Sequence, residues 1–410
     1  MKKLDRDILS LIDIAQKNNL IGRVERDFYK YNDDPNFFSY LIETKDKSFL
    51  NFTDSDSEFR RYFSFDKKKC IVKMFGEVIE RACSSRYNKK DLIWDSYENI
   101  KSNAIDPLEF TFFEKGSSIN YYKNHNQKIN WTEAFSLGSG KKILAPAQLI
   151  YLIYEYKKNE PIISIPISTG TALHSSREKA LLTGILEIIE RDAFMVRYLT
   201  KMKTNLIDET RLEDCGIKKI IQNIKQYNLD VKLVDINLDA PSYSILAILL
   251  DKTEIGPAIS IGLKSDIHLK DAILGALEEC FQVRPWIRSM MILQKKTGKL
   301  YGKNEKLNRG LLWSNKKMLK EISFFLNGDK VIKKDKKYKE KDILSWIIDK
   351  NVSYKDVSLP FLENKFFARK VFSSYFQPLF LDERYPTINH KRISQFVSNY
   401  NINKTPHPFL

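Results

Sequence analysis

The feature that most constrains this chain is a strongly apolar helix that carries charged residues. Residues 168–195 read STGTALHSSREKALLTGILEIIERDAFM, and the second half predicts a helix with apolar side chains on nearly every side. A helix that is apolar all round is buried in a core. Spacings of three and four nevertheless place Glu187, Glu190 and Arg191 on one face. A buried carboxylate is costly unless it is paired or binds a metal ion, so we expect a polar site inside a core.

A structural ion pair between Glu187 and Arg191 is the simplest alternative, but it leaves Glu190 unexplained. A repeat argues further for a site. Residues 73–83 read KMFGEVIERAC and residues 183–193 read TGILEIIERDA, so both contain Glu-x-x-Glu-Arg. In the first copy these residues are Glu77, Glu80 and Arg81. Two pairs of buried glutamates from similar helices can converge on hard cations, which prefer oxygen ligands.

Two further motifs accompany the repeat. Residues 276–282 read ALEECFQ, another apolar helix pattern with acid and amide groups, and the chain closes with TPHPFL. Together these residues resemble the YcaO family, and more closely its stand-alone azoline-forming cyclodehydratase subunits of the streptolysin S type. The family's Ser-Thr-Gly turn, small-residue run and Leu-Glu-x-x-Glu-Arg-Asp-Ala helix correspond to residues 168–193. Weaker matches upstream are Trp131, Ser136–Leu137 and Pro146–Ala147, and the resemblance extends from about residue 60 to the end.

The resemblance implies ATP-dependent cyclodehydration of a ribosomal precursor peptide, in the biosynthesis of an azole-containing bacteriocin or toxin. A Cys, Ser or Thr side chain attacks the preceding amide carbonyl, the resulting oxygen is phosphorylated by ATP, and its departure as phosphate gives a thiazoline or oxazoline. The implied cofactors are ATP and Mg²⁺. Two alternatives stay open: a YcaO enzyme that forms a thioamide or an amidine, and a non-enzymatic docking scaffold of the synthetase complex.

The resemblance also assigns site residues. Glu77, Glu80, Glu187 and Glu190 are the expected Mg²⁺ ligands, and Glu279 is a fifth acid. Arg81 and Arg191 suit phosphate oxygens or hold the glutamates in place. Gln282 suits a neutral contact to nucleotide or water, whereas the adjacent Glu278 is expected to be an exposed or capping acid.

The end of the chain is implied to enter the active site. There the C-terminal carboxylate of Leu410 would act in proton transfer, and Pro406 and Pro408 would restrict the tail to an extended shape. A tail exposed to solvent is the alternative. Two positions depart from the family pattern, since Lys73 replaces a serine and His174 a glycine.

The expected fold is α/β in the broad sense (mixed α+β), a pseudo-duplicated YcaO-like ATP-binding fold without P-loop or Rossmann topology. GSGK at 138–141 is not a P-loop, because Phe135 and Lys142 stand where that motif needs glycine and Ser/Thr. Strands are expected at 143–154 and 371–382. A strand, a turn at 168–170 and a helix N-terminus would offer backbone N–H groups to phosphate. Residues 1–60 are expected to form a structural or docking segment, and residues 61–410 the catalytic domain.

Composition narrows the partners. The net charge is +16, but the lysines are scattered or lie in solvated runs, so no nucleic-acid partner is expected. The four cysteines lack metal or redox spacing, and no apolar stretch approaches the roughly 20 residues that span a membrane. We therefore expect a cytoplasmic protein. Residues 1–60 contain no recognisable peptide-binding domain, so dependence on a partner is expected. The family resemblance implies that this partner is a separate leader-binding subunit, with a flavin-dependent azoline dehydrogenase as an optional further partner.

Overall fold

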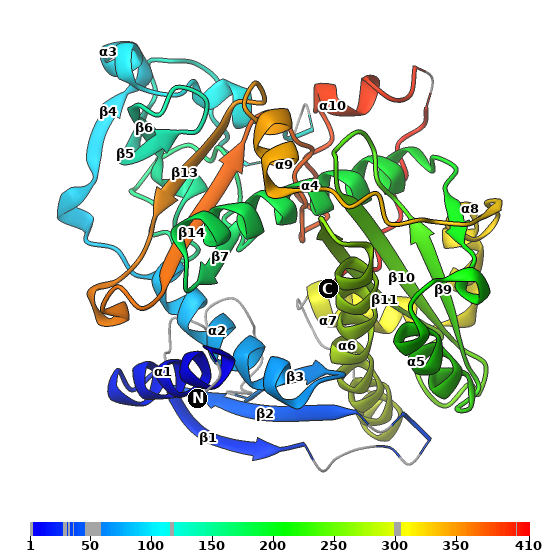
Figure 1. Ribbon diagram of the computed structural model, residues 1–410. Coiled ribbons are helices and arrows are strands. Elements are labelled where there is room, and N and C mark those ends of the chain that lie inside the picture. The colour runs from blue at the N-terminus through cyan, green and yellow to red at the C-terminus, as the bar shows by residue number, and fades with distance from the viewer. Residues whose placement is uncertain are drawn as a thin grey trace.

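The computed structural model describes residues 3–27, 31, 33–35, 37–45, 59–114, 119–298, 305–398 and 400–410. Three sheets form within these ranges (Figure 1). The first consists of β1 (Ile21–Arg26), β2 (Phe38–Thr44) and β3 (Phe59–Ser64). The second orders its strands as β4 (Ile93–Ser96), β5 (Lys128–Ser136), β13 (Val352–Asp356), β14 (Phe367–Ser373) and β7 (Thr171–His174), with β6 (Lys142–Pro146) also paired to β5. The third orders β11 (Ile259–Asp266), β10 (Tyr243–Asp251), β9 (Leu229–Asp235), β8 (Asn205–Ile207) and β12 (Lys330–Val331).

The helices pack on and between these sheets. The longer ones are α1 (Lys3–Lys17), α2 (Lys67–Ser85), α4 (Arg177–Thr200), α5 (Cys215–Lys225), α6 (Leu269–Thr297), α7 (Glu305–Trp313) and α9 (Glu340–Ile347). Three short ones are α3 (Tyr97–Ile100), α8 (Ser323–Leu326) and α10 (Lys391–Ser394). Nearly every sheet pairing in the described residues is antiparallel. This arrangement differs from the parallel sheet of P-loop and Rossmann folds and confirms the predicted fold class.

Helix α4 lies between the second and third sheets, which explains why it is apolar nearly all round (Figure 1). Its first half packs against β14 and α9, through side chains such as Ile185 and Ile189. Its second half, including Phe194 and Val196, packs against the apolar face of β10 and β11. Ser176 begins the helix by accepting a hydrogen bond from the Lys179 N–H. The sequence prediction of a buried central helix is therefore confirmed.

Helices α5 and α6 cover the other face of the third sheet. The approach of α6 to β11 is close, because a Cβ at Gly262 would lie 2.1 Å from the Ala276 carbonyl oxygen. Strand β10 is consequently buried on both faces and is apolar through most of its length. This contact places Glu279 of α6 beside Leu263 of β11, and Gln282 lines the same cavity.

The N-terminal sheet carries α2. Buried apolar residues of α1, β2 and α2 share one core with the second sheet, and Asp66 begins α2 directly after β3. Because β3 runs from Phe59 to Ser64, this sheet spans the expected boundary at residue 60. The division at that residue stays a prediction.

Three expectations for local structure are wrong. The strand expected at 143–154 is β6 alone, followed by a 3₁₀ turn and irregular chain. The strand expected at 371–382 ends at Ser373, and Pro378 lies in irregular chain. The segment before the turn at 168–170 is also irregular, and β7 separates the turn from α4. None of the described helices is long and apolar enough to cross a membrane.

Candidate active site

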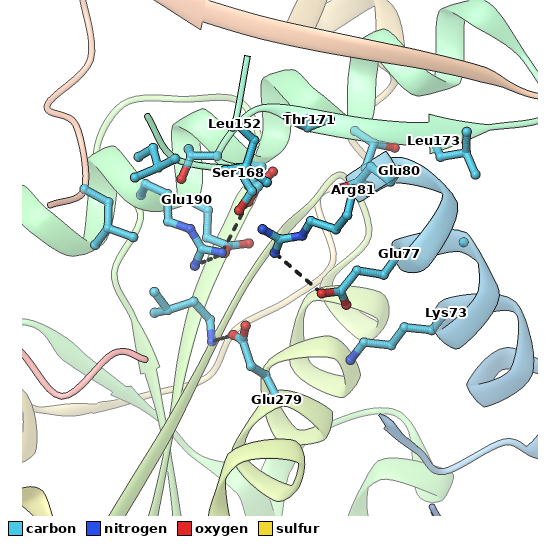
Figure 2. A pocket seen from close by; sticks show the side chains of 18 of the residues that line it. Lys73, Glu77, Glu80, Arg81, Leu152, Ser168, Thr171, Leu173, Glu190 and Glu279 are labelled. Carbon is cyan, nitrogen blue, oxygen red and sulfur yellow. Dashed lines mark hydrogen bonds and ion pairs between the residues drawn. The ribbon is translucent and has the colours of Figure 1, made fainter. Parts of the chain in front are cut away.

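A cavity of about 1260 Å³ lies between α2, α4 and α6 (Figure 2). Its lining brings together residues that are far apart in the chain. Those expected from the sequence are Glu77, Glu80, Arg81, Glu187, Glu190, Arg191, Glu279, Gln282 and Leu410, together with the two variant positions Lys73 and His174. Figure 2 shows Lys73, Glu77 and Arg81 projecting from α2 toward Glu279 of α6. The three apolar helices thus expose their charged side chains to one space.

The α2 wall holds two of the expected carboxylates. Glu77 pairs with Arg81 one turn further along, at 3.5 Å. Burial raises the pKa of the Glu80 carboxyl well above its usual range, while the Arg81 charge and a hydrogen bond from the Leu173 backbone oppose that rise. A carboxyl in this state gains stability when a cation approaches it.

The α4 wall is more deeply buried. Arg191 contacts Glu187 at 3.4 Å and Glu190 at 2.8 Å. Glu190 is 3% exposed and also accepts the Ser265 N–H of β11 at 2.7 Å. Burial raises the pKa of Glu190, and the charges of Arg191 and Lys264 oppose that rise. The simple ion pair of Glu187 with Arg191 therefore exists, but it is part of a larger group of charges.

The α6 wall contributes Glu279, which accepts the Leu263 N–H of β11 at 2.6 Å. Between the two β11 amides that bind Glu279 and Glu190 stands Lys264, whose side chain also lines the cavity. Lys264 was not expected from the sequence, because a single lysine in a strand that also contains Ser260, Ser265 and Asp266 has no pattern that marks it as a site residue. Glu278, expected to be an exposed or capping acid, is half-buried and accepts the Ser64 hydroxyl at 2.5 Å.

The turn before β7 is built around Gly170. Its φ is +82°, and a Cβ at this position would lie only 2.1 Å from the Val371 carbonyl oxygen, so both features require glycine. The Gly170 N–H donates to Glu187 at 2.9 Å, and the Thr171 N–H donates to the Ser168 carbonyl. These two amides are therefore already bonded, so the expectation that the turn offers free N–H groups is wrong for them.

Lys370 of β14 holds the same turn from the other side. Its Nζ donates to the carbonyl oxygens of Ile167 at 2.8 Å and Thr169 at 2.6 Å. Burial lowers the pKa of Lys370 to about 8, against the opposing charge of Glu187. Lys370 was not expected from the sequence. It supports the turn whose Gly170 N–H binds Glu187.

The C-terminal segment reaches the same cavity and is not a frayed tail. Phe409 and Leu410 line the cavity, and Figure 1 marks the C-terminus in the middle of the molecule. The Phe409 ring lies under the Arg191 guanidinium at 4.2 Å. The His407 Nε2 bonds the Phe380 carbonyl at 2.7 Å. Pro408 is buried but does not line the cavity, so its contribution is to the course of the tail.

Mg²⁺ has no complete protein cage among the described residues, where no three acid, His or Cys side chains are close enough to hold one ion. The glutamates are instead held by arginines and backbone amides. This suits Mg²⁺, which keeps several waters and binds through one or two carboxylates plus substrate phosphates. The buried Nε–H groups of Arg81 and Arg191 also find no hydrogen-bond acceptor in the described part of the chain. Phosphate oxygens are acceptors of the kind these donors lack.

The sequence model of the family described as YcaO cyclodehydratase, ATP- and Mg²⁺-binding, matches residues 64–350. The chain belongs to the YcaO family. The family description confirms the expected cofactors, ATP and Mg²⁺. It does not test the roles of individual residues, which stay predictions.

Solved structures share the YcaO fold with this chain. A heterocyclase in complex with substrate and cofactor superposes with a TM-score of 0.77 at 16% identity, over 97% of this chain and 57% of the other. The Escherichia coli microcin synthetase McbBCD complex with pro-MccB17 bound gives 0.64 at 14% identity, over 86% and 88%. YcaO from Methanopyrus kandleri, bound with AMPPCP and Mg²⁺, gives 0.59 at 12% identity, over 91% of each chain.

One curated relative is an uncharacterized protein of Methanothermobacter thermautotrophicus. It is 24% identical over 160 residues, which are 38% of this chain and 41% of the relative. The chain therefore spans about half the length of the first heterocyclase and less than half of this relative.

Proposed function

We propose that this YcaO protein is an ATP-dependent cyclodehydratase that installs thiazoline or oxazoline rings at Cys, Ser or Thr of a ribosomal precursor peptide. The product would be an azole-containing bacteriocin or toxin. The observation that carries the proposal is the shared cavity, where glutamates from three helices meet two arginines and the chain's C-terminal residues. Its volume of about 1260 Å³ exceeds the roughly 300–1,000 Å³ of a typical site for one small ligand. The space therefore suits a nucleotide together with a segment of peptide.

The residues divide into two groups by chemistry. Glu77, Glu80, Glu187 and Glu190 would hold Mg²⁺, with Glu279 as a fifth acid. Arg81 and Arg191 would bind phosphate oxygens while they keep the glutamates in place, and Gln282 would contact nucleotide or water. Bound Mg²⁺ would neutralise charge on the transferring phosphoryl group.

The peptide chemistry would take place at the end of the cavity that Phe409 and Leu410 line. The side chain of Cys, Ser or Thr adds to the preceding amide carbonyl and loses its proton. The former carbonyl oxygen takes the γ-phosphoryl group of ATP, and ADP is released. That oxygen then leaves as phosphate when the C=N bond of the ring forms and the amide nitrogen loses its proton. We assign proton transfer to the Leu410 carboxylate, which requires an approach of about 3 Å or one bridging water.

Partners are part of the proposal. A separate leader-binding subunit would deliver the precursor peptide, and a flavin-dependent dehydrogenase would act on the azoline where an azole is made. The likeness to the E. coli synthetase complex supports an assembly of this kind. Purified alone, the chain is expected to process peptide poorly.

The test is co-expression of this chain with the peptides and proteins encoded by neighbouring genes, followed by mass spectrometry of the peptides. The proposal predicts loss of one water for each ring, dependent on this chain. Exchange of oxygen for sulfur would instead establish the thioamide alternative. Water loss linked to an added amine would establish the amidine alternative. Unmodified peptide with no ATP hydrolysis, even with every partner present, would establish the docking scaffold.

A further inference from the structure

Helix α6 presents two neighbouring faces with different partners. Glu279 and Gln282 line the cavity. Glu278, Phe281, Arg284 and Arg288 follow one another at spacings of three and four, so they share a second face. Glu278 lies where the two faces meet, because it also lines the cavity. This second face contacts the N-terminal segment, which the sequence analysis left without a role in the chemistry.

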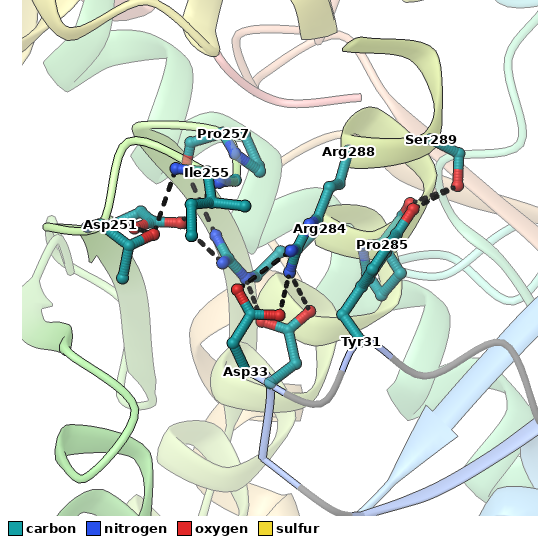
Figure 3. A network of polar contacts seen from close by, with 12 residues as sticks. Tyr31, Asp33, Asp251, Ile255, Pro257, Arg284, Pro285, Arg288 and Ser289 are labelled. Carbon is teal, nitrogen blue, oxygen red and sulfur yellow. Dashed lines mark hydrogen bonds and ion pairs between the residues drawn. The ribbon is translucent and has the colours of Figure 1, made fainter. Parts of the chain in front are cut away.

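Arg288 makes a two-point contact with Asp33 (Figure 3). Its two terminal nitrogens donate to the two carboxylate oxygens of Asp33 at 2.8 and 2.9 Å. The Tyr31 ring covers the guanidinium at 3.7 Å, and the Tyr31 hydroxyl lies 3.1 Å from the Ser289 hydroxyl. A bidentate pair of this geometry fixes orientation as well as distance.

Arg284 joins three segments at one point. It donates to Asp34 at 2.9 Å, to Asp251 at the end of β10 at 2.7 Å, and to the Pro257 carbonyl at 3.3 Å. Its side chain is 1% exposed, so these contacts are out of water. Removal of one partner from such a buried pair leaves an uncompensated charge, which is costly.

The same face of α6 makes further contacts one to two turns before Arg284, toward the N-terminus of the helix. The Phe281 ring packs on the rings of Phe37 and Phe63, and both of these contact Phe65. Glu278 accepts the Ser64 hydroxyl and the Phe65 N–H. The contacts of residues 278, 284 and 288 thus flank Glu279 and Gln282 along the helix.

The helix needs such support at this position. Pro285 lies inside α6 and has no N–H, so it cannot donate the hydrogen bond that would normally reach the Phe281 carbonyl. The turn that contains Gln282 is therefore held less firmly by the helix itself. Contacts from outside the helix set its position.

We propose that Tyr31, Asp33 and Asp34, bound to Arg284 and Arg288, form a brace that positions Glu279 and Gln282 in the nucleotide cavity. The residues of the brace are positioning residues and do not touch the reacting atoms. The inference rests on the proposed function only for the identity of the ligand, MgATP. The claim that these contacts hold α6 in place does not depend on which ligand the cavity binds.

The test compares Asp33→Asn, Arg288→Gln and the double variant with the full-length parent chain. Lys203→Gln is the matched control, because Lys203 forms an exposed pair with Asp329 elsewhere on the molecule. Two quantities are measured at a temperature where each protein is folded: the Kd for MgATP by calorimetry, and amide hydrogen exchange of residues 278–283 without ligand. Arg288→Lys tests recovery by a retained charge.

We expect each single variant to raise the Kd for MgATP about tenfold, as loss of an outer-shell partner does at other metal sites. Exchange at 278–283 should accelerate more than exchange in α5. The double variant should be little worse than either single variant, Arg288→Lys should recover part of the loss, and Lys203→Gln should match the parent.

A purely structural role would accelerate exchange uniformly or lower the melting temperature, with the Kd of the folded protein unchanged. Either result overturns the proposal. If the parent chain binds no MgATP while exchange at 278–283 responds selectively, the proposed function fails and the brace stands.

Discussion

The guanidinium of Arg191 lies 4.2 Å from the ring centroid of Phe409, so the central helix and the C-terminal segment meet face to face. Arg191 also pairs with Glu187 and Glu190 on its other sides. Through Arg191, the glutamates expected to hold Mg²⁺ are linked to the C-terminal segment expected to act on the peptide. A cation–π contact shielded from water contributes about 2 kcal/mol.

Phe409→Leu should therefore lower peptide cyclisation about tenfold while it changes the Kd for MgATP less than about threefold, because the apolar volume stays and the ring face is lost. Phe324→Leu is the matched control, since Phe324 contacts Tyr198 in the same aromatic cluster. Rates are measured with saturating MgATP and the partner subunit. Equal cyclisation rates for the two variants would show that the Phe409 ring does not serve the chemistry.

Glu190→Gln should reduce ATP turnover about a hundredfold, which corresponds to about 3 kcal/mol in the barrier. The fold should stay intact, because burial already disfavours the charged carboxyl and the amide oxygen can still accept the Ser265 N–H. Turnover and melting temperature are measured together. Glu160→Gln is the control, because Glu160 is a buried carboxylate outside the cavity that accepts Asn130 and Lys157 amides. Parental turnover in Glu190→Gln would remove Glu190 from the site.

Substitution of Gly76 should raise the stability of the protein and lower its affinity for nucleotide. Gly76 lies inside α2 on the cavity wall, and a Cβ there would meet no protein atom within 4 Å. Gly76→Ala should stabilise the helix by about 0.5–1 kcal/mol, since glycine is the poorer helix former. The added methyl group should weaken nucleotide binding if the ligand approaches this wall. Higher thermal stability with unchanged nucleotide affinity would place the ligand elsewhere in the cavity.

The buried His390 should cause part of the decrease in the free energy of unfolding at low pH. Burial lowers its pKa to about 4, a hydrogen bond to the Ser374 carbonyl opposes that fall, and the Arg392 charge adds to it. Between pH 6.5 and 4 the unfolded chain binds a proton that the folded protein does not, so stability falls as the pH is lowered through this window.

His390→Asn should remove that contribution, at most about 3.4 kcal/mol, while asparagine keeps an acceptor for the N-terminus of α10. Urea unfolding of both proteins at several pH values measures the difference. A difference in unfolding free energy that is constant between pH 6.5 and 4 would contradict the assignment.

The sequence predicted the central features because they depend on local patterns. The all-round apolar helix, the doubled Glu-x-x-Glu-Arg and the α6 acid identified three helices that do expose these side chains to one cavity. Local patterns also misled, since the Gly170 N–H, expected to be free for phosphate, is occupied by Glu187. Hydrogen bonding between a turn and a helix 17 residues away is decided by packing.

Other residues were missed because their partners are distant in the chain. Lys370 reaches Thr169 across 201 residues, and Arg288 reaches Asp33 across 255. A lone lysine in a strand, or two aspartates in a polar turn, carries no pattern that specifies such a contact. The brace and the support of the Gly170 turn therefore became visible only in three dimensions.

The central claim is that the backbone oxygen of the peptide leaves as phosphate. It is tested most directly with a precursor peptide that carries oxygen-18 in the amide carbonyls preceding its Cys, Ser and Thr residues. The labelled peptide is incubated with this chain, its partner subunit, ATP and Mg²⁺, and the inorganic phosphate is examined by mass spectrometry. The account predicts one labelled oxygen in phosphate for each ring formed, with equal amounts of ADP. Ring formation with unlabelled phosphate would contradict it.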